Sequence, residues 1–175
     1  MRAPGLVIVV TALAVGSVAA ASATAIVAPA EVGREAYRVA PPFRPDQTSV
    51  ERAVDAVIEL VNDERARRGL PVMRPHELVT AAAMAHAADM ADRRAMVHVG
   101  ADGSDTGERL DRAGFVWRSW GEAIGGGYGT PEPLFDAWMA SDEHRPHIIG
   151  EHFYLGVGVA TTSDGVPYWV LVVAS

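Results

Sequence analysis

Three histidines lie close together near the end of the sequence, in the stretch DEHRPHIIGEHF. His144, His147 and His152 lie there with Glu143 and Glu151, although the whole chain of 175 residues has only six histidines. Imidazole nitrogens and carboxylate oxygens bind zinc and related metals, and the same groups transfer protons in catalysis. His144 and His147 have the spacing of one helical face, but Pro146 limits how regular that turn can be. The stretch supplies half of a site at most, so other segments must complete it.

Two further polar residues lie in loop-like, glycine-rich sequence. His98 precedes a run rich in glycine and aspartate, and Glu122 lies in WGEAIGGGYGT. Glycines there let the backbone pass close to another group, so the Glu122 carboxylate either caps a turn or points into a cleft. His86 lies between alanines in a predicted helix, which is typical of a helix-surface or capped core histidine. His76 has no second histidine four residues on, so the zincin motif is absent.

The hydrophobic pattern predicts helices first and strands last. Helical periodicity begins at Thr48 and stops at Gly69, and further helices are expected from Pro75 or Glu77 to Ala95, over 108–113 and over 131–138. Residues 153–160 and 166–173 read as a hairpin, with a third strand at 115–120 or 122–128. This order predicts an α+β layer structure rather than βαβ repeats.

Composition excludes several functions. The net charge is −7 and the arginines form no stripe, so nucleic acid is not an expected partner. The chain has no cysteine and no lysine, which removes thiol, redox and Schiff-base chemistry.

The N-terminal segment predicts export. Arg2 precedes an apolar run from residue 6 to about residue 30, which reads as a signal peptide or, uncleaved, as a membrane anchor. Residues 31–47 carry three prolines and no apolar period, and form a linker. We therefore expect a secreted or extracellular protein, or one anchored by residues 6–30, with a single domain over 48–175. The membrane is expected as a partner only through the N-terminal segment.

The domain resembles a known family in several ordered motifs. These are Asn62 with Arg65, the Gly-Leu after them, loop histidine His98, Gly-Glu at Glu122, Trp138 with Ser141, His144-Arg145, and the closing Tyr-Trp. Together they resemble the bacterial branch of the CAP superfamily (cysteine-rich secretory protein, antigen 5, pathogenesis-related 1), also called the SCP-like extracellular domain.

The resemblance implies an α-β-α sandwich with a central, mainly antiparallel sheet and a cleft lined by His and Glu. His98, Glu122 and His144 take the family's cleft positions and are the expected ligands of a divalent metal such as zinc. His152 resembles a cleft histidine of the animal and plant branch, and the choice between His144 and His152 stays open. Asn62, Arg65, Trp138, Ser141 and Arg145 are expected to be structural.

Two family asparagines are replaced, by Ala123 and His147, so the geometry of the cleft is expected to differ. His147 is expected to be structural. The favoured function is a binding module for a divalent metal, a small apolar or lipid ligand, or a cell-surface ligand, rather than an enzyme. Met73, Met96, Trp117, Trp120 and Phe135 are candidate lining of a lipid groove, or ordinary core. The alternatives are a metal-dependent hydrolase with Glu122 or Glu143 as base, and a purely structural cluster.

Overall fold

The computed structural model describes residues 47–175. The predicted signal or anchor (1–30) and the predicted linker up to residue 46 lie outside the described residues. The elements are α1 (Gln47–Arg67), β1 (Arg74–Pro75), α2 (Glu77–Arg93), α3 (Thr106–Ala113), β2 (Trp120–Gly126), α4 (Pro131–Ala140), α5 (Arg145–Ile149), β3 (Tyr154–Thr161) and β4 (Pro167–Ala174). The predicted helices and the C-terminal hairpin are confirmed, whereas β1 and α5 were not predicted.

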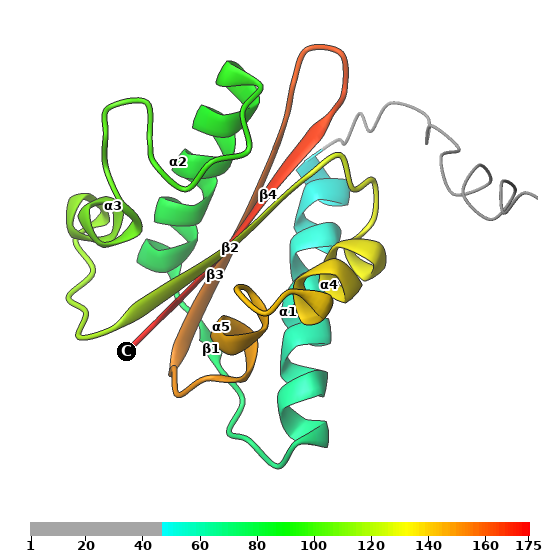
Figure 1. Ribbon diagram of the computed structural model, residues 1–175, viewed down its shortest axis with the longest axis vertical. Coiled ribbons are helices and arrows are strands. Elements are labelled where there is room, and N and C mark those ends of the chain that lie inside the picture. The colour runs from blue at the N-terminus through cyan, green and yellow to red at the C-terminus, as the bar shows by residue number, and fades with distance from the viewer. Residues whose placement is uncertain (1–46) are drawn as a thin grey trace, which may run out of the picture. The chain divides into compact units, whose positions relative to one another are not determined.

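One sheet of four strands forms the centre of the domain, in the order β1-β3-β4-β2. The strands β3 and β4 pair antiparallel, as do β2 and β4, and only the two-residue β1 pairs in parallel with β3. Helices cover both faces, with α2 and α3 on one side and α1, α4 and α5 on the other (Figure 1). The predicted α+β class, with a mainly antiparallel sheet inside an α-β-α sandwich, is confirmed.

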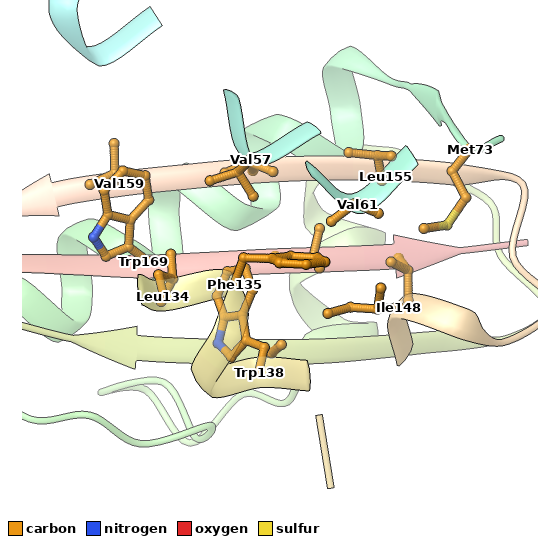
Figure 2. Packing of buried hydrophobic residues seen from close by; sticks show 14 residues of the cluster. Val57, Val61, Met73, Leu134, Phe135, Trp138, Ile148, Leu155, Val159 and Trp169 are labelled. Atoms are coloured by element: carbon orange, nitrogen blue, oxygen red, sulfur yellow. The ribbon is translucent and has the colours of Figure 1, made fainter. Parts of the chain in front are cut away.

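The larger core lies between the sheet and the α1, α4 and α5 layer. Side chains from these three helices meet alternate residues of β3 and β4, because successive strand residues point to opposite faces. Figure 2 shows Val57 and Val61 from α1, Trp138 from α4 and Ile148 from α5 around this contact.

The second core lies between the sheet and α2, and it depends on small residues. A Cβ added to Gly158 of β3 would lie 2.4 Å from the carbonyl carbon of Ala83, so the α2 backbone runs directly over the strand. This close approach brings α2, and with it the buried His86, down onto the sheet. The small residues at Gly158 and Ala83 therefore let the His86 side chain approach β2.

Within residues 47–175, no helix is long and apolar enough to cross a membrane.

Candidate functional site

The candidate site is built around the carboxylate of Glu122, in the middle of β2. Glu122 pairs with Val172 of β4 and its neighbours in sequence, Gly121 and Ala123, are also buried. Successive side chains of a strand point to opposite faces of the sheet. The Ala123 side chain therefore lies on the α1 side, in the larger core, and the Glu122 side chain points towards α2 and α3. Glu122 is only 2% exposed, so its charge requires partners inside the protein.

His98 supplies one of these partners from the loop between α2 and α3. Its Nδ1 lies 2.7 Å from Glu122 Oε1. Because a carboxylate only accepts hydrogen bonds, Nδ1 carries the proton, and the lone pair of the neutral ring lies on Nε2. The His98 side chain is 52% exposed, so it connects the buried carboxylate with the surface.

Arg109 of α3 neutralises Glu122 from the other side. Its Nη2 donates to Glu122 Oε2 at 2.6 Å and also to Thr106 Oγ1, while Nη1 donates to the Ser104 carbonyl. Arg109 is 6% exposed, so the two residues form a buried ion pair. Both carboxylate oxygens of Glu122 are therefore in use.

His86 of α2 lies beneath the same carboxylate. Its Nε2 lies 2.9 Å from the Val97 carbonyl and 3.8 Å from Glu122 Oε1. The contact with Val97 ties the start of the His98 loop to α2. His86 is thus a buried support of the site, in agreement with the core alternative of the sequence analysis.

His144 comes to the site from the opposite side of the sheet. Ser141 ends α4, and its Oγ accepts from the backbone N–H groups of Glu143 and His144. This local turn aims the His144 side chain so that its ring centroid lies 6.0 Å from that of His98. Side chains from two faces of the sheet thus meet at the edge formed by β2.

The other two histidines of the stretch have different neighbours. His147 packs over Gly121, where an added Cβ would lie 2.3 Å from the His147 Nδ1 atom. His152 lies beside the backbone of Gly150, and its electrostatic neighbours are His147 and Arg65. The structure therefore brings His144, and not His152, next to His98.

Charges and burial set the protonation states of the site. Burial raises the pKa of Glu122, but the hydrogen bond from His98 and the charge of Arg109 outweigh it and leave the pKa lowered. Burial lowers the pKa of His144, and the neighbouring His98 lowers it further. Burial likewise lowers the pKa of His86. An ionised carboxylate therefore lies beside two histidines that favour the neutral form.

Residues expected to be structural make the bonds that hold these segments. Asn62 binds the backbone of Met73 through both its side-chain atoms. Arg65, buried in α1, donates to the carbonyls of Pro71, Ile148 and Gly150, and so fixes the end of α5. Trp138 donates from Nε1 to the Ile124 carbonyl of β2, and Arg145 makes an exposed ion pair with Asp142.

The donor set decides how a metal would be held. Among residues 47–175, no group of three or more His, Cys, Asp or Glu side chains is arranged to hold a metal ion. Glu122 accepts a hydrogen bond from His98 Nδ1, as carboxylates commonly do from metal-bound histidines, and its second oxygen accepts one from Arg109. A metal at this edge would have only the two imidazoles of His98 and His144 as donors, with Glu122 in support rather than as the third ligand expected from the family resemblance.

The five candidates for a lipid groove do not lie together. Met73 and Phe135 are buried in the core on the α1 side, whereas Trp117 and Trp120 pack against the core on the α2 side. Met96 is more than half exposed. The sheet separates these residues, so they cannot line a common groove.

Arg109 and the role of His86 were not predicted from the sequence. Arg109 lies in an ordinary amphipathic helix, capped at Asp105 by a capping box, and nothing in its spacing points to a distant carboxylate. One of the two positions expected for the third strand, 122–128, places Glu122 in a strand, and a carboxylate buried there would need a cationic partner.

Comparison with known proteins agrees with this architecture. Residues 58–173 match the CAP family, described as the cysteine-rich secretory protein family. The uncharacterized protein YkwD of Bacillus subtilis (strain 168) is 32% identical over 112 residues, which are 63% of this chain and 44% of that protein. The chain thus spans less than half the length of this curated relative.

Solved structures share the fold at low sequence identity. An extracellular protein containing an SCP domain from Bacillus anthracis has a TM-score of 0.64 at 21% identity, over 75% of this chain and 44% of that chain. An outer surface protein from Borrelia burgdorferi has a TM-score of 0.68 at 15% identity, over 72% of this chain and 94% of that chain. A cysteine-rich secretory protein from Staphylococcus aureus has a TM-score of 0.60 at 17% identity, over 75% and 40% of the two chains.

Proposed function

The chain belongs to the CAP family, the cysteine-rich secretory protein family, and on this premise we propose an exported binding protein that holds a divalent metal between His98 and His144. The observation that carries the proposal is the pairing of these two rings, with centroids 6.0 Å apart, at the edge of β2. They come from segments 46 positions apart, and each is aimed by its own polar contacts.

Each residue has a defined part in this site. Glu122 fixes the His98 tautomer and leaves Nε2 as the metal-binding nitrogen. Arg109 keeps Glu122 ionised, and His86 anchors the loop that carries His98. Burial favours the neutral form of His144, the form that has a lone pair for a metal. A zinc-like ion with two protein ligands keeps further positions open for donor atoms of an external ligand.

Export is supported by the relatives as well as by the apolar N-terminal run. The Bacillus anthracis structure is an extracellular protein and the Borrelia burgdorferi structure is an outer surface protein. An imidazole pair at the surface of an exported domain is accessible to small molecules and to groups on a cell surface. Binding of such a ligand is the function that the site supports best.

The hydrolase alternative has less support. Glu122 is buried, and the hydrogen bond from His98 and the charge of Arg109 lower its pKa, which makes it a weaker base. Glu143 is exposed and contributes to the electrostatics of His144. No observation favours turnover over binding, so we propose binding alone.

The proposal is tested by calorimetric titration of the purified full chain with zinc chloride. We expect one zinc site, lost in His98→Ala and in His144→Ala. The reduction in affinity should exceed the roughly 10–100-fold that loss of a supporting residue costs, because these side chains are the ligands themselves. Cobalt(II) absorption provides a second readout, since it reports nitrogen ligands directly.

His152→Ala is the matched control, because it removes a neighbouring histidine that does not lie next to His98. It should bind zinc like the parent chain. Zinc binding that survives in both His98→Ala and His144→Ala, or the absence of binding to the parent chain, would leave the cluster with a purely structural role.

A further inference from the structure

The three most exposed large apolar side chains of residues 47–175 lie at one end of the sheet. Val116 is 92% exposed, Phe153 is 65% exposed and Val72 is 58% exposed. They belong to three separate connections, from α3 to β2, from α5 to β3 and from α1 to β1. Single exposed apolar residues are normal, whereas a group of them marks a surface that binds a protein or a membrane. We call this group of three the apolar end.

A hydrogen bond and a ring contact hold these connections beside one another. The Phe153 carbonyl accepts from the Arg74 N–H of β1 at 2.9 Å. The rings of Phe115 and Tyr154, which are the neighbours in sequence of Val116 and Phe153, have centroids 5.7 Å apart. Figure 1 shows the start of β2, the start of β3 and the C-terminal end of β4 together at this end of the sheet. The three residues are therefore close in space although they are distant in sequence.

Two tryptophans support the surface beside Val116. The rings of Trp117 and Trp120 meet edge to face, with centroids 6.4 Å apart. Both lie against α3 where Gly107 leaves room, since an added Cβ would lie 2.7 Å from Trp120 Nε1 and 2.8 Å from Trp117 Cζ2. Both side chains are partly exposed. Tryptophan has an apolar ring with a polar N–H, and it is enriched where proteins meet the boundary between water and lipid.

A charged residue lies two positions from each member of the apolar end. These exposed residues are Arg118, Arg74 and Glu151. The ion pairs within residues 47–175 include neither of the two arginines. A guanidinium binds phosphate oxygens through paired hydrogen bonds, so both arginines suit the phosphate groups of lipids. Two cations and one carboxylate therefore flank the apolar end, although the whole chain has a net charge of −7.

The exposure of Val116 favours a bilayer over a protein as the partner. A side chain that is 92% exposed has almost no protein around it, so it lies in no groove or pocket. The residues that dominate protein–protein binding lie in well-packed pockets. An apolar side chain can enter the fluid boundary of a bilayer without a shaped partner, and it gains in proportion to the apolar area buried.

The predicted N-terminal segment brings a bilayer within reach. The apolar run over residues 6–30 predicts a signal or an anchor, so the chain meets a membrane at export. The last turns of α1 lie at the apolar end, where Arg65 donates to the Ile148 and Gly150 carbonyls. The first residue of α1 is about 30 Å away, at 1.5 Å per residue. Residues 31–46 can span roughly 50 Å when extended, so an anchored domain can turn its apolar end towards the bilayer.

We propose that the apolar end binds the surface of a phospholipid bilayer. Val116 and Phe153 enter the boundary between headgroups and acyl chains, Trp117 lies at the level of the headgroups, and Arg74 and Arg118 bind phosphate groups. This contact is separate from the imidazole pair, and it adds to the predicted N-terminal segment a second contact with the membrane.

Quenching of tryptophan fluorescence by brominated acyl chains tests the contact, with the full chain and vesicles of brominated phosphatidylcholine and phosphatidylglycerol. Residues 1–46 contain no tryptophan, so insertion of the N-terminal run cannot itself cause quenching. Trp138 and Trp169 are buried in the core and should stay unquenched. We expect quenching that saturates with lipid, and Trp117→Phe should remove most of it.

Matched variants locate the surface. Val116→Asp should not disturb the fold, because so little of the protein surrounds the side chain, and it should weaken docking about tenfold or more, the loss of one buried valine. Val166→Asp is the control, since it changes an exposed valine at the hairpin between β3 and β4, at the opposite end of the sheet. Arg118→Gln should weaken docking about fivefold, whereas Glu151→Gln should strengthen it.

Absence of quenching with the parent chain would overturn the proposal, as would equal quenching of the parent chain and Val116→Asp. Sedimentation velocity tests a second copy of this chain as the partner. A dimer that Val116→Asp dissociates, without quenching of the parent chain, would assign the apolar end to protein contact and would also overturn the proposal. His98→Ala should be quenched like the parent chain whatever its zinc affinity, because His98 lies in none of the three connections.

Discussion

Glu122 is the residue on which the site depends. It is an ionised carboxylate with almost no exposed surface, and burial of that charge is offset by Arg109 and His98, with His86 beside it. Side chains from α2, from the loop that carries His98 and from α3 therefore converge on Glu122, and contact with Glu122 helps to fix their positions. Removing the charge of Glu122 should be more damaging than removing any single hydrogen bond, because Arg109 would then be buried as an unpaired cation.

Glu122→Gln tests this point, since it keeps the size of the side chain and removes only its charge. We expect the free energy of unfolding to fall by about 3–5 kcal/mol, the cost of breaking a buried ion pair. Urea denaturation at pH 7.5 measures the change. Asp142→Asn is the control, because Asp142 pairs with Arg145 at the surface and its loss should cost less than about 1 kcal/mol. Equal effects of the two substitutions would contradict the role given to Glu122.

The edge strand is the element that joins the two halves of the site. β2 pairs with β4 on one side only, so its other side presents unpaired backbone groups. The indole of Trp138 donates to the Ile124 carbonyl from α4. This bond satisfies one edge carbonyl and holds α4 against β2, and α4 leads directly into the turn that aims His144.

Trp138→Phe should therefore loosen the edge while keeping an aromatic ring in the core. A buried carbonyl left without its donor costs about 1–3 kcal/mol. We expect this loss in urea denaturation, together with faster amide hydrogen exchange in β2 and in the turn at residues 141–144. Trp117→Phe is the comparison, since the Trp117 indole donates to the exposed Asp111. If exchange in β2 is no faster in Trp138→Phe than in Trp117→Phe, the indole does not hold the edge.

Across the whole domain, four of the histidines have their pKa lowered by burial. They are His86, His144, His147 and His152, and in each of them desolvation is the largest cause. Their ordinary pKa in an unfolded chain is about 6.5. Below this pH the unfolded chain takes up protons that the folded domain does not, so the unfolded state binds more protons and stability rises with pH.

The domain should accordingly lose stability as pH falls from about 6.5 towards the lowered pKa values, and it should be nearly insensitive to pH above 7. Urea midpoints at pH 8.0, 7.0, 6.0 and 5.5, measured with EDTA to exclude metal, give the profile. This window lies above the ordinary range of Asp and Glu, so histidines dominate it. His147→Asn removes one of the four groups and should flatten the profile. A midpoint that is constant or rises between pH 7.0 and 5.5 would show that burial does not keep these rings neutral.

Hydrophobic periodicity and the turn and capping residues were sufficient to predict much of the fold, because both depend on interactions within a few residues of sequence. The stop of α1 before Gly69, which has a φ of 71°, and the hairpin at Gly165 follow from local backbone preferences. Thr48 was expected to open α1 but lies inside the helix. The family motifs also pointed to His98, Glu122 and His144, because each residue keeps its place beside a recognisable local pattern.

Only the tertiary structure decided which polar groups meet. The sequence left His144 and His152 as alternatives, and the Ser141 turn together with the fit of His147 over Gly121 places the His144 ring, not His152, near His98. The sequence did not single out Arg109 as the partner of Glu122, because the packing of α3 on the sheet is what brings the two together. Local preferences act between neighbours in sequence, whereas ion pairs and cavities depend on distances that exist only after the layers have packed.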